Sequence, residues 1–325
     1  MGRSLGVRDF GRVGPLQSQA IWHALAAEAA GPMLTFMRPA SPYVSLGMHR
    51  HPGEIDLGYL AERGIPLLRR YAGGGPVYLD DRQLFFQIYL PKEMARGPRA
   101  QLLETLLEPA ASAFRSIVAG AELDGYGEIS AGVRKLCGHG AAEIGRGVVV
   151  VGNVVESFDA ASGSGILKLH PFARERALRL MGRFVGPASE IGAGARFIEE
   201  MTGNYLQLFQ ADGVTEVAEE TLAPRLAGFE RELANPGFVA GAELGIRPPG
   251  QPASIKVRAG VQLLVAEAAG WLAMATVVFG RLEAVEVVGG GVELSGRDAL
   301  GFLARVGPEP GRALLRRLEG LELAA

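Results

Sequence analysis

The chain has 325 residues, of which 48% are hydrophobic and 21% charged, a balance typical of a globular protein with a full core. Its formal net charge is only −2 and its charged runs are short, so neither a nucleic-acid partner nor an anionic membrane surface is indicated. The single cysteine, Cys137, excludes an internal disulfide and a multi-cysteine metal cluster, and no metal site is expected. The N-terminus lacks an apolar signal segment, so we expect a cytoplasmic protein.

The first part of the chain alternates short strands with helices. Pro15 suits the first turn of a helix and Gly31 the position after its last turn. Asp56 and Gly64 bracket a second helix in the same way, as an N-cap and a terminator. The expected elements are, in order, a helix at 15–31, strands at 33–38 and 43–47, a helix at 56–64, and strands at 65–71 and 83–91.

The rest of the chain predicts two folded units joined by a linker. A long helix is expected at 99–119, then two or three strands at 124–159, then helices at 172–233. Residues 236–252 have the proline and glycine density of a linker, and four or five strands and two helices follow. We therefore predict an α+β protein with a catalytic domain at 1–235, a linker at 236–252 and a small C-terminal α+β accessory domain at 253–325.

One apolar run, residues 259–279, is nearly long enough to span a bilayer. Gln262 and Glu267 interrupt it, Gly270 punctuates it, and its two halves alternate like paired strands. The pattern predicts a buried β-hairpin and no membrane span.

The segment RRYAGGGPVYLDD, residues 69–81, carries the first functional signal. Three consecutive glycines cost conformational entropy unless the backbone needs positive φ or a close approach. Beside basic residues, such a turn typically offers backbone N–H groups to an anion. Neither a Walker loop nor the dinucleotide G-x-G-x-x-G spacing is present. From this segment alone, a tight turn without a ligand is an equally good interpretation.

A second glycine-rich segment, GVRKLCGHGAAEIG, contains Lys135 two residues before Cys137 and three before Gly138. Such a lysine is either an exposed cation at a sheet edge or a group that points inward toward the glycine turn. In the second case its ammonium would neutralise a phosphate or a carboxylate that is being activated.

In order and spacing, these two segments and the later VVVVGNVVESFD resemble the lipoate-protein ligase A family of the biotin/lipoate ligase superfamily. That family has an arginine-glycine turn that ends in His-Asp, a K-I-S-G segment and an H-G-T strand. The resemblance covers roughly residues 13–208, and the strand-rich tail resembles the family's small accessory domain. It implies a mixed sheet flanked by helices in the catalytic domain.

The resemblance also implies a two-step reaction. Lipoate or octanoate would react with ATP and Mg²⁺ to give acyl-AMP, and the acyl group would pass to a lysine of a lipoyl-accepting protein. That partner would be a glycine cleavage H-like protein or the E2 lipoyl domain of a 2-oxoacid dehydrogenase. Lys135 takes the catalytic role, stabilising charge on the carbonyl oxygen and the phosphate. The expected substrate- and nucleotide-binding residues are Arg70, Gly73, Gly74, Gly75, Tyr78, Asp80, Gly138 and Asn153.

The sequence departs from the family at three positions. Leu79 replaces the histidine before the aspartate, Cys137 replaces the serine of K-I-S-G, and Val151 stands where the H-G-T strand has its histidine. These changes put the acyl selectivity in question and keep two alternatives open. One is an octanoyl or lipoyl transferase that takes the acyl group from a carrier protein onto Cys137, and the other is a catalytically silent acyl-binding protein. Biotin ligation is disfavoured because the G-R-G-R-x-G signature is absent.

Overall fold

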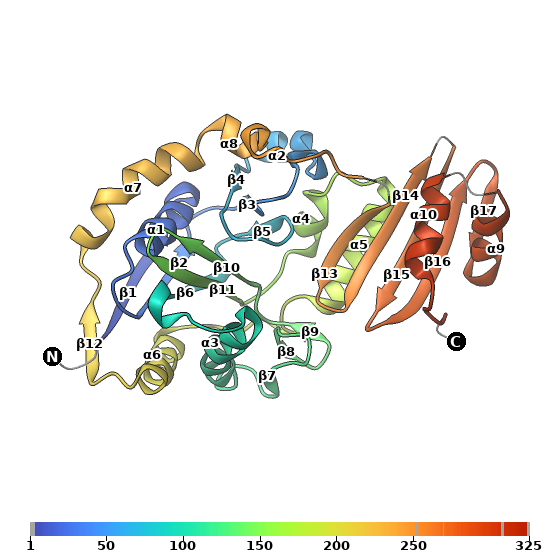
Figure 1. Ribbon diagram of the computed structural model, residues 1–325. Helices are drawn as coiled ribbons and strands as arrows, with labels where there is room; N and C mark the ends of the chain where they lie inside the picture. The colour runs from blue at the N-terminus through green and yellow to red at the C-terminus, as the bar shows by residue number, and fades with distance from the viewer. Residues whose placement is uncertain (1–3, 251, 269, 307–308, 324–325) are drawn as a thin grey trace.

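The N-terminal part of the chain, for which the sequence predicts the catalytic domain, is built on a six-stranded mixed sheet in the order β10-β11-β6-β2-β1-β12 (Figure 1). The computed structural model describes residues 4–250, 252–268, 270–306 and 309–323. The strands are β1 (Ser4–Val13), β2 (Met33–Pro39), β6 (Gln83–Pro91), β10 (His139–Ile144), β11 (Gly147–Val155) and β12 (Gly213–Glu216). β1 pairs in parallel with both β2 and β12, whereas β2, β6, β11 and β10 pair antiparallel. The predicted mixed sheet is thus confirmed.

A hydrophobic core lies on each face of this sheet, and alternate residues of its central strands belong to different cores. On β2, Leu34 and Phe36 belong to the core beneath α3 (Arg99–Phe114) and α6 (Ala195–Phe209). Met33 and Met37 belong to the core beneath α1 (Pro15–Ala27) and α7 (Glu219–Leu233). The helices lie on the two sides of the sheet in Figure 1. This layering confirms the α+β class expected from the sequence.

Two small sheets extend the catalytic domain and carry its glycine-rich segments. One has the order β4-β3-β5 and the other β7-β8-β9. Their strands are β3 (Tyr43–Leu46), β4 (Leu67–Arg69), β5 (Val77–Leu79), β7 (Ala121–Leu123), β8 (Ile129–Ala131) and β9 (Arg134–Lys135). The other helices of this part of the chain are η1 (Pro52–Glu54), α2 (Leu57–Arg63), η2 (Lys92–Met94), α4 (Ala160–Gly165) and α5 (Pro171–Phe184).

The C-terminal domain is a five-stranded antiparallel sheet with two helices. Its elements are β13 (Ala253–Arg258), β14 (Val261–Ala268), β15 (Trp271–Val278), β16 (Arg281–Gly289), β17 (Val292–Ser295), α9 (Gly296–Val306) and α10 (Glu309–Leu318). One face of the sheet packs on α9 and α10, and the other packs on α5 of the catalytic domain. β14 and β15 form the hairpin predicted for residues 259–279. Within the described ranges, no helix is long and apolar enough to cross a membrane.

Three features differ from the sequence-based expectation. β1 and β12 were not predicted, since Arg8, Asp9 and Arg12 break the apolar alternation of β1 and only Leu5 of that strand is fully buried. Part of the expected linker is folded as α8 (Pro236–Ala240) and η3 (Ala242–Leu244). The guanidinium of Arg69 holds α8 against the catalytic domain by donating to the carbonyls of Phe238 and Val239, each at 2.8 Å.

His23 ties α1 to the segment that precedes the glycine turn. Its ring is fully buried, Nδ1 lies 2.7 Å from the carbonyl oxygen of Gln19, and Nε2 accepts a hydrogen bond of 3.1 Å from the Tyr71 N–H. Burial lowers the pKa of His23 from 6.5 to about 3. The folded protein therefore keeps this ring neutral where the unfolded chain protonates it.

We expect acid to destabilise the protein through this histidine. Below the unfolded pKa of 6.5, the unfolded chain binds a proton that the folded state does not, so the free energy of unfolding falls as pH falls toward 3. The His23 contribution to that loss is roughly 2 kcal/mol between about pH 6 and about pH 4. Urea unfolding of the wild type and His23→Gln across this range measures it. Equal slopes of stability against pH in the two proteins would contradict the assignment.

Candidate active site

The glycine turn is shaped by the buried guanidinium of Arg70. This group donates to the carbonyl oxygens of Ser45 at 2.6 Å, Gly73 at 2.7 Å and Gly75 at 2.9 Å. Burial lowers the pKa of Arg70 to about 10, so the group stays charged at neutral pH. In a trans peptide the C=O and N–H groups point in opposite directions, so drawing the Gly73 carbonyl inward turns the Gly74 N–H outward.

The three glycines are exposed and their amides are available to a ligand. Gly74 has φ of +93°, a conformation that favours glycine. A side chain on the neighbouring Gly47 would lie 2.0 Å from the Gly74 carbonyl oxygen, so the turn packs directly against another backbone. Within the described part of the chain, neither backbone nor side-chain oxygens accept a hydrogen bond from the amides of Gly73, Gly74 or Gly75. Such free amides are the groups that bind anions.

The strand that follows the Lys135 segment runs beside this turn. A side chain at Gly140 would meet the Cβ of Ala72 at 3.6 Å and the Gly73 carbonyl oxygen at 4.0 Å, so β10 runs beside the turn. Lys135 is the last residue of β9, and its Cε lies 3.9 Å from the position that a Cβ would take at Gly138. Its side chain is 19% exposed, and Nζ lies 2.8 Å from Glu128 Oε1.

A chain of buried amides connects the lysine segment to the end of the glycine turn. The Gly138 N–H donates to Asn153 Oδ1 at 2.6 Å, and Asn153 Nδ2 donates to Gln83 Oε1 at 2.5 Å. Gln83 Nε2 in turn donates to Asp80 Oδ1 at 3.4 Å. Asp80 is 2% exposed, and burial raises its pKa. Asn153 and Asp80 are therefore placed to orient the two segments, and Gln83, absent from the sequence-based list, links them.

Tyr78, also predicted to bind substrate or nucleotide, is 8% exposed. It packs in an apolar cluster with Ile166 and Leu167, and burial raises the pKa of its hydroxyl. The carbonyl of Tyr78 joins the amide chain by accepting from Gln83 Nε2 at 3.3 Å.

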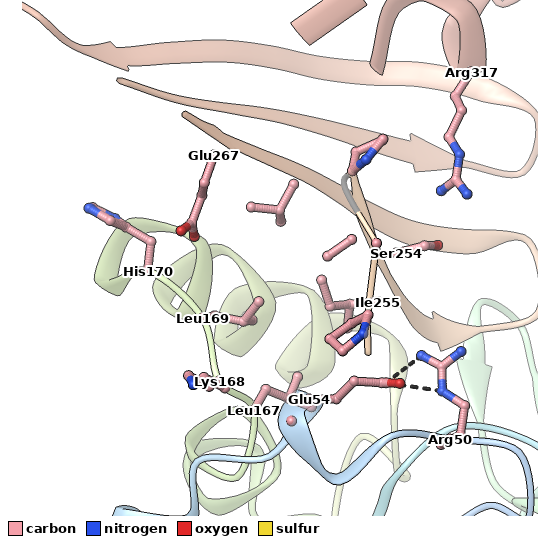
Figure 2. Close-up of a pocket in the computed structure, with 16 residues that line it drawn as sticks. Arg50, Glu54, Leu167, Lys168, Leu169, His170, Ser254, Ile255, Glu267 and Arg317 are labelled. Carbon is pink, nitrogen blue, oxygen red and sulfur yellow. Dashed lines mark hydrogen bonds and ion pairs between the residues drawn. The ribbon is translucent and has the colours of Figure 1, made fainter. Parts of the chain in front are cut away.

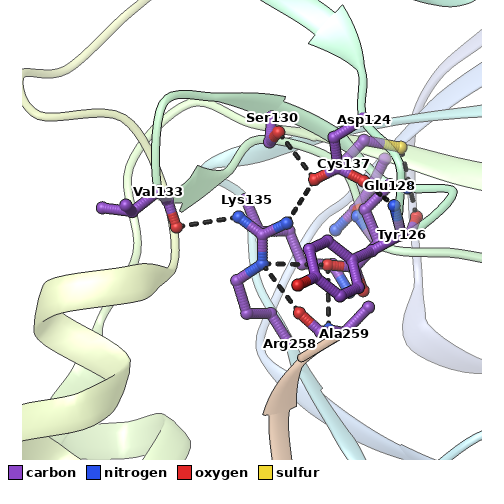
Figure 3. A network of polar contacts seen from close by, with 11 residues as sticks. Asp124, Tyr126, Glu128, Ser130, Val133, Lys135, Cys137, Arg258 and Ala259 are labelled. Carbon is purple, nitrogen blue, oxygen red and sulfur yellow. Dashed lines mark hydrogen bonds and ion pairs between the residues drawn. The ribbon is translucent and has the colours of Figure 1, made fainter. Parts of the chain in front are cut away.

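Two carboxylates that sequence reasoning missed belong to the polar network that includes Lys135 (Figure 3). Asp124 accepts hydrogen bonds from the backbone amides of Tyr126 and Glu128 and from the hydroxyl of Ser130. The Glu128 side chain is 4% exposed and pairs with Lys135. The only sequence signal for this cluster is the acidic turn DGYGE, residues 124–128, which precedes the lysine segment.

His139 is a further group that the sequence did not assign to the site. Its pKa falls to about 4, first because it is buried and second because the positive charge of Lys135 is close. The ring is therefore neutral at physiological pH. Among the described residues, no hydrogen-bond partner reaches its buried Nδ1. A neutral imidazole with one free nitrogen thus lies in the neighbourhood of Lys135.

Cys137 points away from this polar cluster. Its side chain is fully buried in the core beneath α3 and α6, and Sγ lies 3.4 Å from the Gly138 carbonyl oxygen. Burial raises the pKa of the thiol to about 12, so it is protonated at neutral pH. A protonated, inaccessible thiol is a poor nucleophile.

A separate cavity of about 700 Å³ lies between the two domains (Figure 2). Charged side chains from both domains line it, among them Arg50, Glu54, Lys168, Glu267 and Arg317. Arg50 and Glu54 form an ion pair on its catalytic-domain side. Neither Lys135 nor the glycine turn contributes to its lining, so it is distinct from the site described above.

Comparison with known proteins gives a consistent family. The model of the lipoyl protein ligase A/B catalytic domain matches residues 16–178. Lipoate–protein ligase 1 of Staphylococcus aureus is 26% identical over 118 residues, which cover 36% of this chain and 35% of that protein. The chain thus matches about a third of the length of this curated relative.

Solved structures extend the likeness to the fold. A bi-partite lipoate protein ligase of Thermoplasma acidophilum, described with its E2 lipoyl domain, has a TM-score of 0.66 at 19% identity, over 74% of this chain and 97% of that chain. Lipoate-protein ligase A bound with ATP has a TM-score of 0.58 at 20% identity, over 74% and 99%. P. falciparum LipL1 in complex with lipoate has a TM-score of 0.56 at 11% identity, over 97% and 98%. The last likeness extends over both domains.

We expect Arg70→Lys to lower the free energy of unfolding by about 2 kcal/mol or more. The compact ammonium of lysine cannot reproduce the planar guanidinium, which donates hydrogen bonds to three backbone carbonyls. Denaturant unfolding measures the loss. Arg146→Lys is the matched control, because Arg146 is exposed and its guanidinium donates to the Glu28 carbonyl at the long distance of 3.4 Å. An unchanged midpoint for Arg70→Lys would show that the turn does not depend on the guanidinium.

Proposed function

The chain belongs to the lipoyl protein ligase A/B catalytic domain family, and on that premise we propose that it is an ATP-dependent lipoate–protein ligase. The observation that supports the proposal is a glycine turn with free backbone amides that lies against Gly140 of β10, the strand that follows the Lys135 segment. The two segments would provide one cation and several N–H donors for the anions of an acyl-adenylation reaction. The ATP-bound and lipoate-bound relatives with the same fold support this choice of substrates.

In the first step, a carboxylate oxygen of lipoate or octanoate attacks the α-phosphorus of ATP, and pyrophosphate leaves. The glycine amides would bind phosphate oxygens, and Lys135 would lie against the acyl carboxylate and the α-phosphate, where negative charge increases. In the second step, the amine of an acceptor lysine attacks the acyl carbonyl, AMP leaves, and an amide forms. Lys135 would then stabilise the carbonyl oxygen as it becomes negative.

Magnesium would bind at this site through the phosphates of the nucleotide. Within the described ranges, there is no group of three or more histidine, cysteine, aspartate or glutamate side chains that could hold a metal ion. Mg²⁺ is commonly bound through substrate phosphates and one or two carboxylates. Bound in that way, it would neutralise the leaving pyrophosphate.

The acceptor is proposed to be a lipoyl domain, of the E2 type or an H-like protein. The Thermoplasma relative, described with its E2 lipoyl domain, supports this partner. Leu79 is 8% exposed and packs in the core beneath α1, so it cannot supply the polar contact of the histidine it replaces. The choice between lipoate and octanoate is left to the assay. A cytoplasmic location suits an ATP-dependent reaction and a single free thiol.

We expect the purified protein, incubated with Mg-ATP, lipoate or octanoate, and a lipoyl domain, to add one acyl group to the domain. Lys135→Ala is expected to lower acyl-AMP formation at least a hundredfold while the protein stays folded, because its role is electrostatic. Intact-mass spectrometry of the acceptor and detection of acyl-AMP are the measurements. Lys92→Ala is the control, since Lys92 pairs with Glu143 on the surface. Acyl-AMP formation by Lys135→Ala at the wild-type rate would refute the site assignment.

The buried thiol distinguishes the ligase from a cysteine-dependent transferase. We expect Cys137→Ala to retain ATP-dependent lipoylation at a substantial fraction of the wild-type rate, because Cys137 packs as a small apolar side chain. The wild type should form no thioester with octanoyl carrier protein, and iodoacetamide should not label the native thiol at pH 8. An acyl adduct on Cys137, with transfer that needs no ATP, would favour the transferase.

A further inference from the structure

The carboxylate that holds Lys135 is shared with an arginine of the C-terminal domain. Glu128 contacts Lys135 Nζ through Oε1 and contacts Arg258 through Oε2, with Arg258 Nε at 3.3 Å. The same Oε2 accepts a hydrogen bond of 3.0 Å from the Ala259 amide. Figure 3 shows Arg258 entering this cluster from β13 while Lys135 lies on the catalytic domain. One buried carboxylate thus joins the proposed catalytic lysine to the second domain.

Arg258 is itself 1% exposed, so its charge depends on these partners. It also pairs with Asp124 and donates to the carbonyl oxygen of Val133 at 2.8 Å. An uncompensated buried charge is strongly unfavourable, which makes this contact set specific. The cluster of Lys135, Arg258, Asp124 and Glu128 holds two positive and two negative groups and is formally neutral.

The end of the C-terminal sheet is built to hold Arg258 in place. The turn that follows β15 packs on the turn that follows β13, where the Phe279 amide donates to the Gly260 carbonyl at 2.6 Å. Phe279 has φ of +48°, which is uncommon for a bulky residue. Its ring centroid lies 5.4 Å from the Arg258 guanidinium carbon and 5.3 Å from the ring centroid of Tyr126 in the catalytic domain. The strained turn and the guanidinium therefore dock together on residues 124–128.

We propose that Arg258 is a positioning residue that sets how strongly Glu128 holds Lys135. The proposal rests on the proposed ligase function of Lys135. With Arg258 docked, Glu128 divides its charge between two cations, and the Lys135 ammonium is available to the acyl carboxylate and the phosphate. Without Arg258, two carboxylates face one ammonium, leaving a net charge of −1 that holds Lys135 and repels an anionic substrate.

The first test replaces Arg258 by glutamine, which removes the charge and keeps most of the side-chain volume. We expect kcat for acyl-AMP formation to fall about tenfold or more, with a smaller change in KM for lipoate, because the defect lies in Lys135 and not in the acyl pocket. Arg258→Lys, which keeps the charge, should recover part of the rate. Arg176→Gln is the matched control, because Arg176 pairs with Glu286 across the same two domains and does not belong to this cluster.

The second test removes the acid as well. In Glu128→Gln/Arg258→Gln, the charged groups that remain in the cluster are Lys135 and Asp124, so the local charge returns to neutral. We expect this double variant to form acyl-AMP faster than Arg258→Gln. A merely structural role of Arg258 predicts the opposite, since two buried substitutions would add their damage. A double variant that is as slow as Arg258→Gln, or slower, would overturn the proposal. Thermal unfolding confirms that each variant is folded.

The third measurement does not depend on ligase activity. Reductive methylation of amines with formaldehyde, read by peptide mass spectrometry, reports how tightly Lys135 is held, with Lys92 as the internal reference. We expect Lys135 labelling to fall severalfold in Arg258→Gln and to rise again in the double variant. Labelling that is unchanged or increased in Arg258→Gln would refute the charge-sharing proposal. If labelling behaves as expected but the wild type forms no acyl-AMP, the proposed function fails while the charge sharing stands.

Discussion

The glycine turn and its surroundings depend on two buried arginines whose charges must be satisfied by backbone oxygens. Arg69 donates from one nitrogen to the carbonyls of Gly47, Met48 and Arg50, and Arg70 donates to those of Ser45, Gly73 and Gly75. Buried charges are tolerated only when their hydrogen-bonding capacity is used, so the loops must adopt shapes that deliver these carbonyls. The outward orientation of the turn amides follows from that requirement. The arginines thus shape the glycine turn while their own donors are used by backbone carbonyls, and the proposed function assigns the cation of the site to Lys135.

Apolar packing and ion pairs also hold the C-terminal domain against α5 of the first domain. An apolar cluster joins α5 to the β13-β14-β15 face, with Phe184, Leu263 and Met274 among its members. Ion pairs surround that cluster, since Arg183 contacts Glu283 at 2.6 Å and Arg176 contacts Glu286. Hydrophobic burial provides the affinity and the charges fix the orientation. Arg258 can enter the catalytic domain because this larger contact holds its strand in position.

Local signals in the sequence predicted the elements that depend on local chemistry. The cap residues Asp56 and Gly64 define α2 as expected, with the Asp56 side chain accepting from the Tyr59 amide at 3.0 Å. The turn at Gly270 and the alternation around it were sufficient for the β14-β15 hairpin. β1 and β12 could not be recognised, because a ten-residue strand rich in charge and a four-residue edge strand exist only through pairing with distant neighbours. Their partners are defined by the tertiary fold.

The residues of the candidate site also fall into two groups: those that a local motif reveals and those that only long-range contacts bring together. The glycine turn and the lysine segment could be found from sequence because each is a short motif, and the fold brings Gly140 of β10, the strand after that segment, beside the turn. The carboxylates and Arg258 could not, since Arg258 lies 134 residues from Asp124 and an arginine in a strand carries no signal of its partner. His139 was also missed, because a neutral imidazole near a lysine is recognisable only once burial and proximity are known. On the proposed function, the motif residues would define where an anion binds, and the long-range contacts would determine how available the lysine is to that anion. A related chain could keep the motif and lose the acid at Glu128 or the cation at Arg258. On the proposed function, its glycine turn would still bind an anion, but its lysine would have different ion-pair partners. The residues at these two positions would therefore report how the lysine is held, which the motif alone does not.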